Sequence, residues 1–320
     1  MVVAPGVKKS WEMQVGEVGG TSVRIPITVV NGTLPGPTLC VTAGIHGCEY
    51  DSIEAAIRIA NNTKPEGLSG ALIVLPIINV MSFQQKTAFV NPLDNTNMNR
   101  IYPGDPKGSI SRRMNHTIFN EVVLKSNFLI DLHGGDLTES IQSHVMVKTT
   151  DQPEIDSWSR KLALAFDIKY RWELEVSGIP GYPGYPKGTI TYEAPIRGIP
   201  SVTAEAGERG KMEEASVRVL YDGIKNCMSL LKMTDSPAFQ NSNQKLIRHG
   251  AIVSPQTTGL FYPNVQCGDL VKKGDGLAVI KGLDGLVKET MTSPVDGVVL
   301  SLTPLMVSNP ADVVLLVVET

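Results

Sequence analysis

The sequence lacks the features that mark membrane, secreted and nucleic-acid-binding proteins. None of its apolar runs approaches the roughly 18 residues of a membrane span. The N-terminal segment MVVAPGVKKSWEMQVGE has no apolar stretch behind its lysines, so it does not resemble a secretory signal. A net charge of −3 and a pI near 6.0 argue against nucleic acid or an anionic membrane as the main partner. We expect a cytoplasmic protein with no nucleic-acid and no membrane partner.

Cysteine is also scarce. The four cysteines, Cys40, Cys48, Cys227 and Cys267, are scattered without CxxC spacing. Cys40 and Cys48 lie in or beside an apolar region, where a free thiol behaves as a small hydrophobic side chain. We expect the cysteines to be unpaired, as in a reducing compartment.

What is present is the composition of an ordinary globular protein, with 42% hydrophobic and 19% charged residues. A length of 320 residues suits one large domain or two unequal ones. Short apolar runs predict buried strands at 37–43, 72–80, 127–132, 144–149 and 201–206.

Segments with helical periodicity alternate with these strands. Their apolar stripes are Ile53, Ile57 and Ala60; Ile110, Met114, Ile118 and Val122; and Val217, Leu220, Ile224 and Met228 within a predicted helix over 211–231. This alternation predicts an α/β sheet with helices on its faces. Ligands of such sheets collect at the carboxyl ends of the strands.

The composition and the hydrophobic pattern of the sequence change after about residue 235. A polar, linker-like segment is followed by short β-type runs broken by glycine, which predict a small all-β module. We therefore divide the chain into a catalytic domain, 1–238, and a β module, 239–320. Within the first part, 178–188 (GIPGYPGYPKG) predicts a loop that could act as a lid.

Metal-ligating side chains follow two of the predicted strands. Gly44-Ile45-His46-Gly47-Cys48-Glu49 follows the first strand, and His133 ends Asp131-Leu132-His133. Two imidazoles and one carboxylate are the protein ligands of catalytic zinc sites that keep a fourth position open. If the helix begins just after the strand, the spacing of His46 and Glu49 places both on one helix face. Asp131 either orients an imidazole or pairs with a backbone donor.

Two further polar motifs accompany these candidates. Glu205, in Thr203-Ala204-Glu205-Ala206-Gly207, interrupts an apolar strand, and a buried carboxylate is costly unless it is paired. It is either a general base beside the metal or half of a structural ion pair with an arginine. Asn99 and Arg100, before a Pro-Gly turn, can present an amide and a guanidinium to a substrate carboxylate.

With these motifs the sequence resembles the succinylglutamate desuccinylase/aspartoacylase family, relatives of the zinc carboxypeptidases. GIHGCE, NMNRIYPG, DLHGG and TAEAG occur in the family's order and roughly its spacing. The resemblance implies a zinc-carboxypeptidase-like mixed sheet flanked by helices, with one zinc ion per chain held by His46, Glu49 and His133. It implies that Glu205 is the general acid/base and that Asn99 with Arg100 binds a substrate carboxylate. The implied reaction is hydrolysis of a non-peptide amide (C–N) bond in a small N-acyl amino acid.

One position departs from the family pattern. Such enzymes usually carry another arginine before the Asn-Arg pair, but residues 81–98 contain none. Ala88 and Phe89 occupy the corresponding position. Electrostatic stabilisation of the oxyanion would then have to come from zinc, Lys86, Arg112 or Arg113. The loss of one such donor can cost about 100- to 1,000-fold in rate.

The tail resembles a biotinyl/lipoyl-type barrel-sandwich module. Thr292, in Met291-Thr292-Ser293-Pro294, stands where such carriers have the modified lysine. We therefore expect an unmodified module with a packing or assembly role, and a homo-oligomer stays open. The alternatives to a zinc deacylase are a carboxypeptidase acting on short peptides and a non-catalytic metal or small-molecule binding protein.

Overall fold

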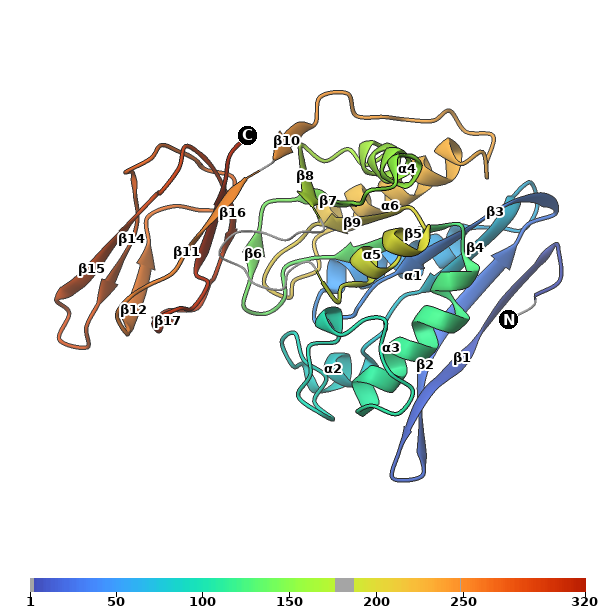
Figure 1. Cartoon of the computed structure of the whole chain (residues 1–320), viewed down its shortest axis with the longest axis horizontal. Coiled ribbons are helices and arrows are strands. Elements are labelled where there is room, and N and C mark those ends of the chain that lie inside the picture. The colour runs from blue at the N-terminus through green and yellow to red at the C-terminus, as the bar shows by residue number, and fades with distance from the viewer. Residues whose placement is uncertain (1–2, 176–186, 248) are drawn as a thin grey trace.

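The structure is a computed structural model that describes residues 3–175, 187–247 and 249–320. Figure 1 shows a large α/β part, which contains the N-terminus, and a separate all-β part at the C-terminal end of the chain. Among the described residues, no helix combines the length and apolar character that a membrane crossing needs. Most of the predicted 178–188 loop lies outside the described residues.

A mixed sheet, nine-stranded within the described residues, forms the centre of the α/β part. Its strand order is β1 (Val7–Val18), β2 (Thr21–Asn31), β4 (Ser69–Leu75), β3 (Leu34–Thr42), β5 (Phe128–His133), β9 (Ser201–Glu205), β7 (His144–Thr149), β8 (Tyr170–Glu175) and β10 (Lys245–Ile247). The four central strands β4, β3, β5 and β9 are parallel, and β7 pairs antiparallel with β9. Three of the parallel strands, β3, β5 and β9, therefore end beside one another.

Helices cover both faces of this sheet (Figure 1). One buried core contains side chains of α1 (Tyr50–Asn62), α4 (Pro153–Leu164) and α6 (Glu214–Leu230). The second contains side chains of α3 (Ile110–Glu121) and α5 (Ile190–Glu193). Successive residues of β3 alternate between the cores, with Leu39 and Val41 in the first and Cys40 in the second. This alternation explains why the central strands are apolar on both faces.

The five strands predicted from apolar runs are found as β3, β4, β5, β7 and β9, although β4 ends at Leu75 and not at residue 80. The three helical stripes are confirmed as α1, α3 and α6, although Ile57 of α1 is 39% exposed and lies off the buried stripe. Elements that were not predicted include both strands of the β1–β2 hairpin, α4 and β8. All four cysteines are unpaired, as expected.

The C-terminal part consists of two antiparallel sheets. One has the order β11 (Gly250–Val253), β18 (Leu315–Val318), β16 (Gly297–Leu302) and β13 (Leu270–Val271), with β6 (Ser140–Ile141) added to β16. The other has the order β15 (Val287–Thr292), β14 (Gly276–Lys281), β12 (Gly259–Pro263) and β17 (Val307–Ser308).

Contacts in both directions join the two parts. β6, from the first part of the chain, pairs with β16, and β10, from the region after residue 238, pairs with β8 of the large sheet. A separate apolar cluster packs Trp172, Tyr170 and Met146 of the large sheet against Val298, Leu300 and Val318 of the tail. The tail is therefore held, by both backbone pairing and apolar burial, against the amino-terminal ends of β7 and β8, which lie beside the carboxyl end of β9.

Candidate metal centre and active site

A short connection between β3 and α1 carries the first two candidate ligands. Glu49 immediately precedes α1, with φ −86° and ψ 70°, and its N–H donates to the carbonyl of His46. The prediction that one helix face presents both side chains is therefore wrong, because the helix begins only at Tyr50. Gly47 permits this turn, since a Cβ there would lie 2.2 Å from the backbone nitrogen of Phe83.

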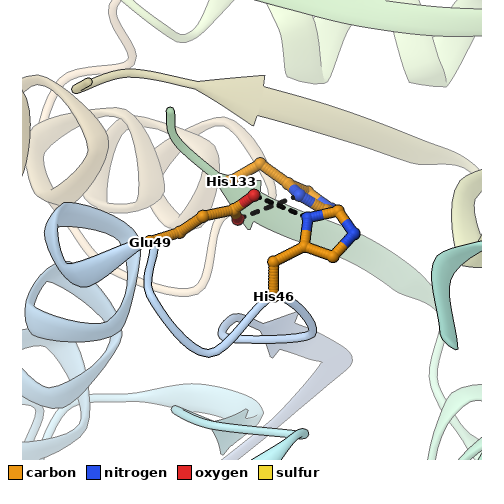
Figure 2. A group of neighbouring side chains, drawn as sticks. All are labelled: His46, Glu49 and His133. Atoms are coloured by element: carbon orange, nitrogen blue, oxygen red, sulfur yellow. Dashed lines mark hydrogen bonds and ion pairs between the residues drawn. The ribbon is translucent and has the colours of Figure 1, made fainter. Parts of the chain in front are cut away.

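The three candidate ligands meet at the carboxyl edge of the sheet (Figure 2). His133 is the last residue of β5, and its side chain faces the turn that holds His46 and Glu49. His46 Nδ1 lies 2.6 Å from Glu49 Oε1, and His133 Nδ1 lies 3.1 Å from Glu49 Oε2. One ligand atom from each residue lies within 4.8 Å of the others, and all three residues are buried.

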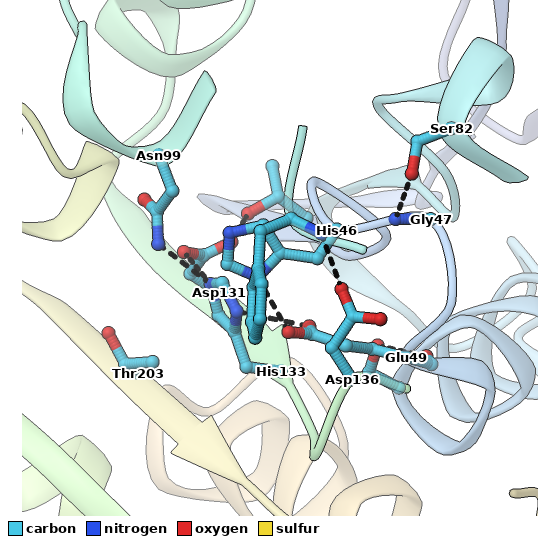
Figure 3. A network of polar contacts seen from close by, with 12 residues as sticks. His46, Gly47, Glu49, Ser82, Asn99, Asp131, His133, Asp136 and Thr203 are labelled. Carbon is cyan, nitrogen blue, oxygen red and sulfur yellow. Dashed lines mark hydrogen bonds and ion pairs between the residues drawn. The ribbon is translucent and has the colours of Figure 1, made fainter. Parts of the chain in front are cut away.

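The outer nitrogens of both imidazoles have partners of their own (Figure 3). His133 Nε2 lies 2.9 Å from Asp131 Oδ2, and Asp131 Oδ1 accepts a 2.6 Å hydrogen bond from the Thr42 hydroxyl. His46 Nε2 lies 3.3 Å from Asn97 Oδ1. Because carboxylate and amide oxygens accept hydrogen bonds, these contacts favour the tautomer with hydrogen on Nε2 and a free lone pair on Nδ1.

This arrangement fits a metal ion. In that tautomer two Nδ1 lone pairs face a buried carboxylate, which is repulsive unless a cation lies between them. Glu49 Oε2 accepts no hydrogen bond from any described residue, although it lies 3.1 Å from His133 Nδ1. Burial opposes ionisation of Glu49, but when the two imidazoles are protonated their charges outweigh burial and lower the pKa of Glu49 to about 2. The residues supply negative charge, two nitrogen donors and an oxygen donor at one point.

Glu205 ends β9, directly beside His133 in the sheet register. Burial raises the pKa of its carboxyl to about 7. No arginine of the described residues forms an ion pair with Glu205, so the structural pairing considered from the sequence is absent there. A carboxyl with a pKa near neutrality exchanges protons readily at physiological pH.

Asn99 and Arg100 lie on a short 3₁₀ helix, Met98–Arg100. Asn99 is buried, its Nδ2 lies 3.5 Å from His133 Nε2, and its Oδ1 has no hydrogen-bond partner among the described residues. Arg100 is exposed and donates from Nη1 to the carbonyl of Asn99 at 2.8 Å. Asn99 thus contacts the ligand cluster at the outer nitrogen of His133.

A cavity of about 570 Å³ brings these residues together. Its lining includes His46, Glu49, His133, Glu205, Asn99 and Arg100. Tail side chains, among them Leu300, Leu302 and Leu316, line it as well. The size is typical of a pocket for a small ligand, and the pocket combines polar groups from the sheet with apolar walls from the tail.

The cavity also contains polar residues that the sequence analysis did not single out. Glu139 lines it, and burial together with the charges of Glu205 and Glu49 raises the pKa of Glu139 to about 8. His144 Nδ1 lies 2.9 Å from the carbonyl of Gln142, and burial lowers the pKa of His144 to about 4. Lys148 and Thr203 also line the cavity. The sequence could have indicated Lys148 and His144, because both are polar residues within a run, 144–149, that is predicted to be a buried strand.

The cations proposed to replace the missing arginine lie elsewhere. Lys86 is exposed, and neither it nor Arg112 nor Arg113 belongs to the lining of the cavity. Phe89, one of the two residues expected at the position of the missing arginine, does line the cavity, and its ring packs edge-on against the His46 ring with centroids 5.2 Å apart. Its backbone N–H donates to the Asp136 carboxylate at 2.8 Å.

The sequence and the fold are similar to those of known proteins. A profile of the succinylglutamate desuccinylase/aspartoacylase catalytic domain matches residues 35–231. The chain is 27% identical over 267 residues to the N-alpha-acetyl-L-2,4-diaminobutyric acid deacetylase of Halomonas elongata, covering 80% of this chain and 74% of that protein.

Two solved structures share the fold across nearly the whole chain. The product-bound ectoine utilization protein EutE (DoeB) from Ruegeria pomeroyi has a TM-score of 0.88 at 22% identity, covering 99% of this chain and 98% of that one. The succinylglutamate desuccinylase/aspartoacylase structure from Rhodobacter sphaeroides has a TM-score of 0.87 at 22% identity, covering 100% and 98%. The likeness therefore extends beyond the catalytic domain to the C-terminal β sheets.

Proposed function

Because the chain belongs to the succinylglutamate desuccinylase/aspartoacylase family, we propose that it is a zinc-dependent hydrolase of the amide bond in small N-acyl amino acids. The observation that carries this proposal is the convergence of His46, Glu49 and His133 in one cavity with Glu205. The deacetylase from Halomonas elongata, which is named for an N-acetyl diamino acid substrate, supports the substrate class.

We propose His46, Glu49 and His133 as the zinc ligands. Two imidazoles and a carboxylate are a donor set that suits zinc and leaves a position open. When bound, zinc supplies Lewis-acid polarisation of the scissile carbonyl and lowers the pKa of water. Asp131 fixes the tautomer and orientation of His133 through the 2.9 Å contact to Nε2.

Glu205 acts as general base and then as general acid. Its carboxylate takes a proton from the attacking water and returns it to the nitrogen of the leaving amine, so that the carbonyl carbon–nitrogen bond breaks and a neutral amine departs. A pKa near 7 suits both transfers at physiological pH. Arg100 and Asn99 hold the substrate carboxylate through a guanidinium and an amide.

The C-terminal β sheets take part as a wall of the pocket. We propose that they form an unmodified barrel-sandwich module spanning about residues 239–320. Its side chains exclude water from one side of the cavity, which Leu300 and Leu302 line. Exclusion of water strengthens the electrostatic interactions inside the site.

The test is a substrate screen with zinc-loaded protein. The panel contains N-acetyl amino acids, N-succinyl amino acids, N-acetyl-L-2,4-diaminobutyrate and short peptides. We expect release of free amine from one or more N-acyl amino acids, and loss of both zinc and turnover in His133→Ala. Preference for peptides would support a carboxypeptidase instead, and binding of ligands without any turnover would support a non-catalytic binding protein.

A further inference from the structure

Lys148 is a buried lysine whose ammonium group contacts a hydroxyl and no carboxylate among the described residues. Its residue is 2% exposed, on β7, and its Nζ donates to Thr203 Oγ1 at 3.1 Å. No carboxylate of the described residues forms an ion pair with it, and the remaining stretches, 1–2, 176–186 and 248, contain no Asp or Glu in their sequence. An ammonium group has three donors, of which one has an acceptor among the described residues, and a buried charge without an ion-pair partner is costly.

The sheet directs Lys148 to the side that carries the proposed active site. In the pairing of β7 with β9, His144 is opposite Glu205 and Met146 is opposite Thr203. Alternate residues of a strand share a face, so Lys148 lies on the face of His144 and Met146. Glu205 is in turn beside His133 of β5. Lys148 accordingly lines the same cavity as the three candidate metal ligands.

A second cation, Arg100, lines this cavity too. Burial, with a contribution from the charge of Arg100, lowers the pKa of Lys148 to about 8, against the opposing effect of Asp131 and Glu205. At neutral pH the amine is thus still largely protonated. Two positive groups that face one cavity repel each other and together attract an anion into it.

Resting on the proposed function, we propose that Lys148 Nζ binds a carboxylate oxygen of the N-acyl amino acid substrate. Lys148 would then supply, from β7, a cation inside the cavity, whereas Lys86, the one cation of the 81–98 segment, lies outside the cavity lining. The carboxylate belongs either to the amino acid or to a dicarboxylic acyl group such as succinyl. The Thr203 hydroxyl, held in turn at 2.8 Å from the Thr191 hydroxyl, positions the amine for this contact.

The test measures ligand binding rather than turnover. In a Glu205→Gln background, which we expect to bind substrate without hydrolysing it, calorimetry compares carboxylate ligands with their amides. The ligands are N-acetyl-L-2,4-diaminobutyrate, N-acetyl-L-aspartate and N-succinyl-L-glutamate. Adding Lys148→Met removes the charge but keeps a linear side chain of similar length. Lys86→Met, at an exposed lysine outside the cavity lining, is the matched control.

We expect Lys148→Met to weaken binding of the carboxylate forms by about 10- to 100-fold, as for loss of a hydrogen-bonded charge. The amide that removes the contacted carboxylate should be nearly insensitive to Lys148→Met, since that contact is already lost. Using amides of the α-carboxyl and of the succinyl carboxyl separately identifies which carboxylate is bound. Lys148→Gln, which retains a donor for Thr203, should show the same loss, and Lys86→Met should show none.

Equal weakening of carboxylate and amide ligands, or none, would overturn the role of Lys148 and leave the proposed function standing. Failure of every ligand to bind the Glu205→Gln protein would overturn both. If thermal unfolding shows that Lys148→Met does not fold, Lys148→Gln is used in its place. The deciding quantity is then the same, namely the ratio of the affinities for the carboxylate ligand and for its amide.

Discussion

The substitution Asp131→Asn tests whether the second contact of His133 controls metal binding. Asp131 is 1% exposed and accepts two hydrogen bonds. Its Oδ1 accepts from the Thr42 hydroxyl at 2.6 Å, and its Oδ2 accepts from His133 Nε2 at 2.9 Å. Asparagine offers one oxygen and one NH₂ group in the same shape. If the asparagine oxygen keeps the hydrogen bond from the Thr42 hydroxyl, its NH₂ group faces His133 Nε2. Because NH₂ is a donor, Nε2 must then accept, which favours the tautomer with hydrogen on Nδ1.

That tautomer places a proton where the metal ion would bind. Removal of such an outer-shell partner costs about 10- to 100-fold in metal affinity, and the tautomer argument places Asp131→Asn near the upper end. In free energy this is about 1.4 to 2.7 kcal/mol. Competition of the purified protein against a chromophoric zinc chelator measures the affinity directly.

Asp156→Asn is the matched control. Asp156 is also buried, and it accepts from the Thr150 N–H and hydroxyl at 2.8 and 2.9 Å, but it lies on α4 and outside the cavity lining. We expect this control to lower thermal stability and leave zinc affinity unchanged. Wild-type affinity in Asp131→Asn, or an equal loss in Asp156→Asn, would refute the reasoning.

Three further predictions follow from the site and the tail. Glu205→Gln should keep its zinc content and fold but lose at least about 100-fold in kcat, as expected when general-base catalysis is removed; near-normal kcat would make Glu205 structural. Arg100→Lys should raise KM for N-acyl amino acids more than it lowers kcat, because a docking contact is shared by ground and transition states; equal turnover of carboxylate and amide substrates by the wild type would remove Arg100 from substrate binding. Mass spectrometry of protein produced with active biotin and lipoyl ligases should find no adduct on residues 240–320, since we expect Thr292 to stand where such carriers have the modified lysine; an adduct there would show that the tail is a carrier.

The strands that position the candidate site were predictable because they are buried on both faces. The 37–43, 127–132 and 201–206 runs became β3, β5 and β9, and polar residues at their ends marked the carboxyl edge of the sheet. The β1–β2 hairpin was missed because its outer strand is largely exposed and its polar residues hide the pattern. In β8 the buried residues Tyr170, Trp172 and Leu174 alternate with more exposed ones. This pattern indicates a strand, but it is not a continuous apolar run.

The local geometry of the site was less accessible to sequence reasoning. A spacing of three residues between His46 and Glu49 fits both a helix face and a turn, and only the start of α1 at Tyr50 distinguishes them. Lys148 was not singled out because lysines are usually solvated. Its burial depends on how β7 packs between β8 and β9 and on the tail strands that close the cavity, contacts between segments far apart in the chain.

The most direct test of the central claim is a zinc titration of metal-free protein, with the rate of hydrolysis of an N-acyl amino acid as the readout. The account predicts no turnover without metal, a linear rise in rate, and a plateau at one zinc ion per chain. The rate of hydrolysis by the His133→Ala variant should not rise over the same range of zinc concentration. Full turnover by the metal-free protein, or no turnover of any N-acyl amino acid at one equivalent of bound zinc, would contradict a zinc-dependent deacylase.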